Sequence, residues 1–113
     1  MHELPVTEQI LQVTLDHARK AGARRVAHVN LVVGDLTSFV DESIQFYFDF
    51  LSRDTEAEGA VLHVRRVPAR VRCHACQQEF APDGIDWRCP HCGGLGGEVL
   101  AGRESFIESI EVE

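Results

Sequence analysis

Four cysteines are the residues with the clearest chemistry in this sequence. They stand in two C-x-x-C pairs, Cys73 with Cys76 and Cys89 with Cys92, and twelve residues separate the pairs. Each pair offers two thiolates on one tight turn, and zinc takes four such donors at the corners of a tetrahedron. The spacing therefore predicts one structural zinc site made from all four cysteines.

Other uses of the four thiols remain open at this point. An iron centre of the rubredoxin type would use the same sulfurs, although zinc is the commoner occupant of such ribbons. A redox dithiol would need its C-x-x-C at a strand-to-helix junction, and a disulfide framework would need an oxidising compartment. His74 and His91 lie inside the two pairs, and we interpret them as exposed spacers because four thiolates already satisfy the ion.

The amino terminus offers a different metal chemistry. The chain starts Met1-His2-Glu3, and a bulky second residue normally protects the first methionine from removal. The Met1 amine, the His2 amide nitrogen and a His2 ring nitrogen can then close two fused chelate rings on one ion. The Glu3 amide nitrogen or its carboxylate can supply a fourth donor. Planar nitrogen donors select Ni(II) or Cu(II) over zinc, and the alternative is a solvated tail.

Periodicity predicts the elements that position these groups. A wide apolar stripe predicts a helix over residues 5–21, and a second helix follows with Asp41 as its expected N-cap. Alternating apolar residues predict three strands. They cover residues 25–34, 60–67 and 105–112, and the apolar positions Phe106, Ile110 and Val112 share one face of the last strand.

Two helices on one face of a three-stranded sheet make a small α+β fold. The four-cysteine segment lies between the second and third predicted strands, so we interpret it as an inserted zinc-ribbon-like module, with Phe80 and Trp87 as its small apolar content. We assign residues 1–68 plus 98–113 to one α/β domain and residues 69–97 to an inserted zinc-binding domain.

Composition narrows the function classes. The chain has 113 residues, 44% of them hydrophobic and 26% charged, which is ordinary for one globular domain. Neither a membrane-length apolar run nor a secretory signal stands out, so we expect a cytoplasmic protein without a membrane partner. We expect no enzyme, because four thiolates leave zinc no open position and the glycines at 93–97 lack the Lys-Ser/Thr of a phosphate loop.

The charge distribution supplies an alternative function. The net charge of −7 argues against a general nucleic-acid binder. The stretch from His63 to Cys76, however, holds four arginines (Arg65, Arg66, Arg70, Arg72) and no acid. The alternative to a metal carrier is therefore a zinc-ribbon module that contacts nucleic acid or an acidic protein through this stretch.

Several short motifs in a fixed order resemble a known family. Between the Met1-His2-Glu3 start and the two C-x-x-C pairs stand Gly34-Asp35-Leu36 and Gly59-Ala60-Val61-Leu62, and after the pairs stand Gly102-Arg103-Glu104 and Ser109-Ile110-Glu111. This pattern resembles the HypA/HybF family of nickel-insertion accessory proteins for [NiFe]-hydrogenase maturation. The resemblance covers essentially the whole chain.

The resemblance implies a nickel metallochaperone that works with the GTPase HypB and delivers Ni2+ to the hydrogenase large subunit, and we expect a monomer or homodimer. It also implies that His2 is the essential nickel ligand with Glu3 as its neighbour in the motif, and that Cys73, Cys76, Cys89 and Cys92 bind zinc. Together with the chelate chemistry of the Met1 amine, this makes His2, Met1 and Glu3 the candidate nickel-binding residues. Family members often place histidines just outside the cysteine pairs, whereas here they lie within. We therefore transfer no pH-sensing role to His74 or His91.

Overall fold

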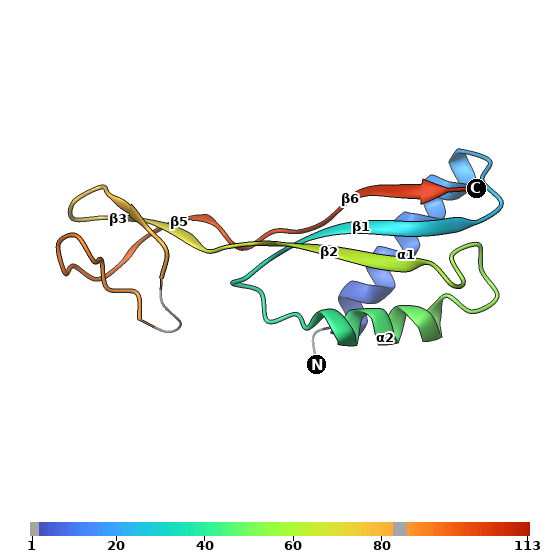
Figure 1. Ribbon diagram of the computed structural model, residues 1–113, viewed down its shortest axis with the longest axis horizontal. Coiled ribbons are helices and arrows are strands. Elements are labelled where there is room, and N and C mark those ends of the chain that lie inside the picture. The colour runs from blue at the N-terminus through green and yellow to red at the C-terminus, as the bar shows by residue number, and fades with distance from the viewer. Residues whose placement is uncertain (1–2, 83–85) are drawn as a thin grey trace. The chain divides into compact units, whose positions relative to one another are not determined.

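The computed structural model describes residues 3–82 and 86–113. Two helices and two three-stranded sheets make up the described fold, which confirms the α+β class (Figure 1). By its contacts the chain divides into two compact units. The helix–sheet unit comprises the residues up to Val32, Ser38–Arg65 and Ser105–Glu113, and the cysteine unit comprises Val33–Thr37 and Arg66–Glu104. The domain boundaries predicted from the sequence remain a prediction.

The helix–sheet unit contains the helices α1 (Glu3–Lys20) and α2 (Asp41–Leu51). The first sheet has the order β2-β1-β6, and its strands are β1 (Val26–Gly34), β2 (Val61–Val67) and β6 (Ser105–Val112). Arg25 and Glu113 exchange backbone hydrogen bonds where β1 starts and β6 ends, so these two strands run antiparallel. Helix α1 contacts both α2 and β6, and Figure 1 shows it crossing behind the strands.

The core of this unit lies between the helices and the central strand. On α2, Ile44 and Phe48 are four residues apart and both fully buried, as the spacing predicts. On β1, Val29 and Leu31 are buried while the intervening Asn30 is only half-buried. Neither helix in the described part of the chain is long and apolar enough to cross a membrane.

One local prediction was wrong. The N-cap of α2 is Val40 in an extended conformation rather than Asp41, and the Glu3 carboxylate accepts the Val40 N–H at 3.0 Å, the donor that the carboxylate of a capping box would take. On β6, Phe106 and Val112, which the alternation places on one face, are exposed by 51% and 42%, so this face is largely open to solvent.

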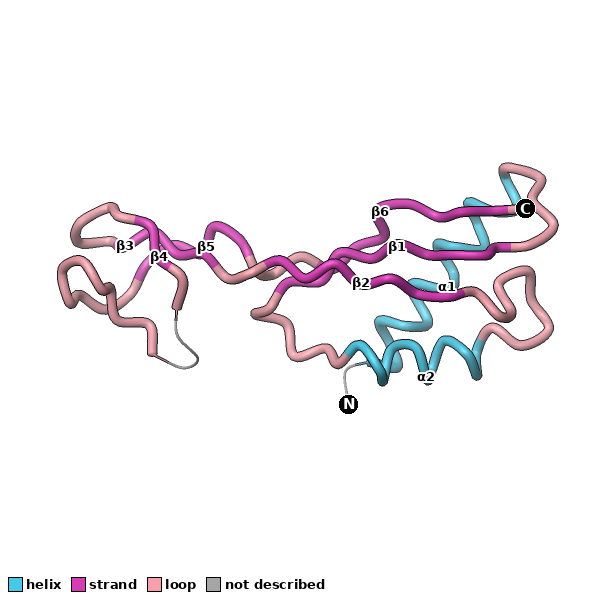
Figure 2. The backbone as a smooth tube through the Cα atoms, in the orientation of Figure 1, coloured by secondary structure: helices cyan, strands magenta, loops and turns pink. Residues whose placement is uncertain are grey.

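The cysteine unit has a second sheet of order β4-β3-β5. Its strands are β3 (Arg70–Cys73), β4 (Glu79–Phe80) and β5 (Gly97–Ala101), all antiparallel to their neighbours, and Figure 2 shows how short they are beside the loops. The sequence did not predict these strands, because β4 has two residues and β5 starts inside the glycine-rich segment. All three lie between β2 and β6 along the chain, as predicted for the cysteine segment.

Two of the motif glycines meet at a close backbone crossing within the cysteine unit. The Gly34 N–H donates to the Glu104 carbonyl at 2.7 Å, and the Leu36 N–H donates to the Gly102 carbonyl at 2.8 Å. A Cβ atom on Gly34 would stand 2.0 Å from the Gly102 oxygen. Gly102 itself has a φ of +115°, a conformation that favours glycine. Close approach therefore explains why both positions carry no side chain.

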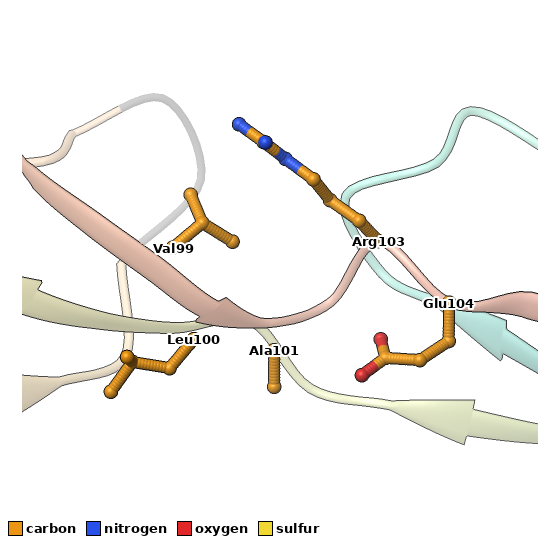
Figure 3. A pocket seen from close by; sticks show the side chains of 5 residues that line it. All are labelled: Val99, Leu100, Ala101, Arg103 and Glu104. Carbon is orange, nitrogen blue, oxygen red and sulfur yellow. The ribbon is translucent and has the colours of Figure 1, made fainter.

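A shallow hollow of about 310 Å³ lies beside this crossing, lined by Val99, Leu100, Ala101, Arg103 and Glu104 (Figure 3). The Glu104 Oε1 atom accepts a hydrogen bond from the Gly102 N–H at 2.7 Å. Figure 3 shows the Arg103 side chain extending away from this carboxylate. Glu104 thus stabilises the crossing, and the hollow brings together no acid–base pair.

Candidate metal sites

The four cysteines predicted to bind zinc do converge in the cysteine unit. Cys73 ends β3 and the other three stand on the loops that follow. All four sulfurs lie within 4.8 Å of one another, and two of the separations, Cys73 to Cys92 and Cys76 to Cys89, are 3.6 Å. Four sulfurs at about 2.3 Å from one zinc ion would stand about 3.8 Å apart. The sulfur arrangement therefore fits tetrahedral zinc.

The two C-x-x-C turns have the same backbone design. The residue four positions after the first cysteine donates its N–H to that cysteine's carbonyl, Gln77 to Cys73 at 3.0 Å and Gly93 to Cys89 at 2.8 Å. Both donors have positive φ, 65° for Gln77 and 75° for Gly93. Each turn therefore directs its two sulfurs to one side, and the pair of turns supplies four donors to one ion.

Backbone amides favour a thiolate at Cys73. Hydrogen bonds from the N–H of Cys76 and, more weakly, of Ala75 lower the pKa of the Cys73 thiol to about 7. The Gln78 N–H lowers the pKa of the Cys76 thiol, but desolvation and the adjoining thiols outweigh it and raise this pKa to about 12. Neighbouring sulfurs resist a second negative charge, and a bound dication removes that resistance.

The site's surroundings match the sequence interpretation in two respects. Phe80 is buried with the cysteines in one small cluster, and Trp87 packs against it, as expected for the module's apolar content. His74 and His91 are both exposed, and the metal-binding group consists of the four sulfurs. Four thiolates close the coordination sphere, so the site can stabilise a fold and has no position for a substrate.

Of the predicted nickel ligands, Met1 and His2 lie outside the described residues, and Glu3 is the first residue of α1. Glu3 is 5% exposed. Its backbone carbonyl accepts a hydrogen bond from the Thr7 hydroxyl, and its carboxylate accepts the Val40 N–H. This contact joins the start of α1 to the start of α2. No local sequence pattern indicates this contact, because the two residues are 37 positions apart.

The arginine-rich stretch is paired with carboxylates. Arg65 contacts Glu108 at 2.9 Å, and Arg66 stands 4.0 Å from Asp35. The other two arginines contact carboxylates within the cysteine unit. Arg70 and Arg72 each lie 3.9 Å from the Glu79 carboxylate. Arg72 also lies 3.7 Å from the Glu98 carboxylate. Each arginine of the stretch therefore has a carboxylate nearby, which lowers the net positive charge that a phosphate backbone would meet there.

The α+β unit and the four-thiolate unit together describe a metal-binding protein whose four-cysteine site is structural rather than catalytic. The chain matches, over residues 1–112, the family described as hydrogenase/urease nickel incorporation, metallochaperone, hypA. It therefore belongs to the HypA family of nickel metallochaperones, which take part in hydrogenase maturation. This confirms the family resemblance.

Individual relatives match this chain over all or nearly all of their length. The hydrogenase maturation factor HypA of Dehalococcoides mccartyi is 44% identical over 113 residues, which are 100% of this chain and 95% of the relative. That of Caldanaerobacter subterraneus subsp. tengcongensis is 41% identical over 114 residues, with 100% of both chains covered. The solution structure of the nickel metallochaperone HypA from Helicobacter pylori has the same fold, with a TM-score of 0.68 at 21% identity over 99% of this chain and 97% of that one.

Proposed function

We propose that this chain binds Ni(II) at its amino terminus, through Met1, His2 and Glu3, and delivers it during maturation of [NiFe]-hydrogenase. Membership of the HypA family supports the cargo and the process. The contacts that hold Glu3 in place support the position of the nickel site at the amino terminus. Glu3 is 5% exposed and its carboxylate accepts the Val40 N–H, so the residue next to His2 is held between two helix starts.

The anchoring also bears on the choice of donors. The Met1 amine and a His2 ring nitrogen take the two positions beside the His2 amide nitrogen in a square plane, so we favour a Glu3 carboxylate oxygen over the Glu3 amide nitrogen as the fourth nickel ligand, and the Val40 N–H on Oε2 positions this carboxylate. The three nitrogens and one oxygen suit the square-planar preference of Ni(II). A site built largely from backbone nitrogens at a chain terminus can open and release its ion.

The two metals are then kept apart by donor chemistry. Soft thiolates in a closed tetrahedron retain zinc, whereas planar nitrogens select nickel. A carrier needs this separation, because nickel must leave while the metal that stabilises the fold stays. We propose that the GTPase HypB and the hydrogenase large subunit are the partners in delivery. Nickel transfer from loaded protein to metal-free large subunit, with and without HypB, tests these partners, and transfer should require His2.

The test of the nickel site compares His2→Ala with His17→Ala in untagged, zinc-loaded protein. His17 is an exposed histidine in the last turn of α1 and serves as the matched control. Equilibrium dialysis should show that His2→Ala loses the tight nickel site while zinc content and helical circular dichroism stay unchanged. His17→Ala should bind nickel as the wild type does. Equal nickel affinity in His2→Ala and wild type would refute the proposed site.

The amine ligand has its own test in pH and in chemical blocking. A terminal amine with an ordinary pKa of about 7.7–8.0 must lose its proton to bind, so nickel affinity should fall as the pH drops below neutrality. Protonation of His2 below about pH 6.5 should steepen the fall. Acetylation of the amine, or one glycine added before Met1, should weaken binding with every side chain in place. Unchanged affinity after both modifications would exclude the amine.

A further inference from the structure

Two histidines of the helix–sheet unit lie together, away from the cysteines. His28 of β1 and His63 of β2 bring Nδ1 and Nε2 to 2.9 Å from each other. Their ring centroids are 5.0 Å apart and the rings are tilted by 39°. His28 is half-buried and His63 is exposed, so solvent and ions reach the pair. Neither the zinc cluster nor the proposed amino-terminal site uses them.

We propose that His28 and His63 form a second transition-metal site, which takes Ni(II) as a pair of cis imidazole ligands. Imidazole nitrogens bind such ions at about 2.0–2.1 Å. Two nitrogens on one ion are then about 3.0 Å apart at the right angle of square-planar or octahedral geometry, and about 3.4 Å apart at a tetrahedral angle. The observed 2.9 Å matches the first case. The strands therefore hold the two nitrogens at a separation that cis coordination of nickel can use.

The strands hold this pair in place before an ion arrives. Both histidines stand on neighbouring strands of the same sheet, whose hydrogen bonds fix the two backbones. In the metal-free form the rings share one hydrogen bond. When a metal binds, the ring that donates this bond moves its proton to its other nitrogen, so both rings stay neutral and both facing lone pairs become available. The exposed His63 ring has the freedom to turn toward a shared ion.

The charges around the pair do not oppose a cation. Arg65 lies two residues beyond His63 and so on the same face of β2, but its guanidinium contacts the Glu108 carboxylate at 2.9 Å. On β1, the residue two beyond His28 is Asn30, which is uncharged and bonds the Ser109 hydroxyl at 3.0 Å. With two protein ligands and water in the remaining positions, the site should bind nickel more weakly than the four-donor site at the amino terminus.

The experiment uses the full chain, zinc-loaded, in a His2→Ala background, so that the amino-terminal site does not mask a weaker one. Nickel titrations followed by calorimetry should show a second, weaker nickel site there. His63→Gln and His28→Gln should each abolish it, and His17→Ala should keep it. Glutamine can preserve a hydrogen bond with the remaining histidine but offers no imidazole nitrogen, so this change separates a ligand from a merely structural residue.

A second readout locates the ion directly. Substoichiometric Ni(II) should broaden the ring-proton resonances of His28 and His63 before those of His17, His74 and His91 in the same background. Either of two results would overturn the proposal: no nickel binding in His2→Ala protein, or weak binding that both glutamine variants retain. In either case the histidines are a hydrogen-bonded pair only. The proposed function is tested separately, because it depends on the tight site in protein with native His2.

Discussion

The two units of this chain are stabilised by different means. The helix–sheet unit buries a broad apolar core, which includes Ile10, Leu15, Val26, Val29, Leu31, Ile44 and Phe48. The buried cluster of the cysteine unit consists of Val71, Cys73, Phe80 and Cys89. Two of these four are among the cysteines positioned to hold a metal ion, so the small core and the metal site overlap. We expect the first unit to fold through apolar burial and the second through metal binding.

This difference fits a carrier of one metal that depends on another. The unit that anchors Glu3 needs no zinc to form its core, so the proposed nickel site can load and unload without disturbing the thiolates. Conversely, we expect the cysteine unit to lose its fold when it gives up its ion. The comparison predicts that mutations in the two units have separable effects.

The largest effect should come from removing a zinc ligand. Cys89→Ser deletes one of four donors from a site whose metal-binding free energy is about 10–16 kcal/mol in small zinc domains. Because Cys89 is also part of the unit's buried cluster, zinc should be lost and amide resonances of the cysteine unit should collapse. Resonances of the helix–sheet unit should persist. Exposed His91, within the same C-x-x-C pair, is the control, and His91→Ala should keep zinc.

That comparison would fail if Cys89→Ser protein melted as a whole, since the helix–sheet unit would then depend on zinc too. It would also fail if the variant kept one zinc per chain and its full set of resonances. Elemental analysis and a two-dimensional amide spectrum distinguish these outcomes from the expected one.

The next prediction tests whether apolar burial stabilises the helix–sheet unit. Phe48 is fully buried on α2, and Phe48→Ala should lower the free energy of unfolding by about 3–5 kcal/mol through lost burial and a cavity. Phe46 on the same helix is 68% exposed, so Phe46→Ala should change stability by less than about 0.5 kcal/mol. Denaturant unfolding followed by helical circular dichroism measures both. Zinc content should stay at one per chain under native conditions in both variants.

A smaller effect is expected at the backbone crossing, which stabilises the cysteine unit without using metal. Gly34→Ala places a Cβ atom 2.0 Å from the Gly102 oxygen, so the crossing must open. We expect a loss of about 1–3 kcal/mol, typical of overpacking, with zinc retained. Gly22→Ala is the control for the loss of a glycine without a steric clash. Gly22 has positive φ, and no atom lies within 4 Å of a Cβ atom added there. Thermal unfolding should show Gly34→Ala as the less stable variant.

The sequence was informative where local pattern decides the structure. Both helices and all three strands of the first sheet followed from periodicity, and the spacing of the cysteine pairs predicted their convergence. It was uninformative where distant residues meet. The Glu3 to Val40 bond displaced the expected cap at Asp41, and only the strand order brings His28 beside His63. Such contacts depend on tertiary packing, which no local spacing encodes.

The smallest predicted effect is a pH dependence within the helix–sheet unit. Arg19 and Glu56 form a two-pronged ion pair, with separations of 2.7 Å and 3.1 Å. The hydrogen bond from Arg19, followed by one from backbone, lowers the pKa of the Glu56 carboxyl from 4.5 to about 2. A depressed carboxyl pKa contributes stability above the unfolded value, and this contribution is lost as the pH falls from about 4.5 toward 2. Since the Arg19 side chain is 54% exposed and the Glu56 side chain 30% exposed, solvent screens the pair, and its contribution should be small and reduced by salt.

The measurement compares wild type with Glu56→Gln by urea unfolding across this pH range, followed by helical circular dichroism. Both described helices belong to the helix–sheet unit, so this signal does not report acid release of zinc from the cysteine unit. The wild type should be the more stable protein near neutral pH, and the difference should shrink as Glu56 becomes protonated. The exposed Glu8, on the same helix as Arg19, is the control for removing a carboxylate. If the Glu56→Gln difference stayed constant down to pH 2, the ion pair would not be the source of that stability, and packing of the Glu56 side chain would have to account for it.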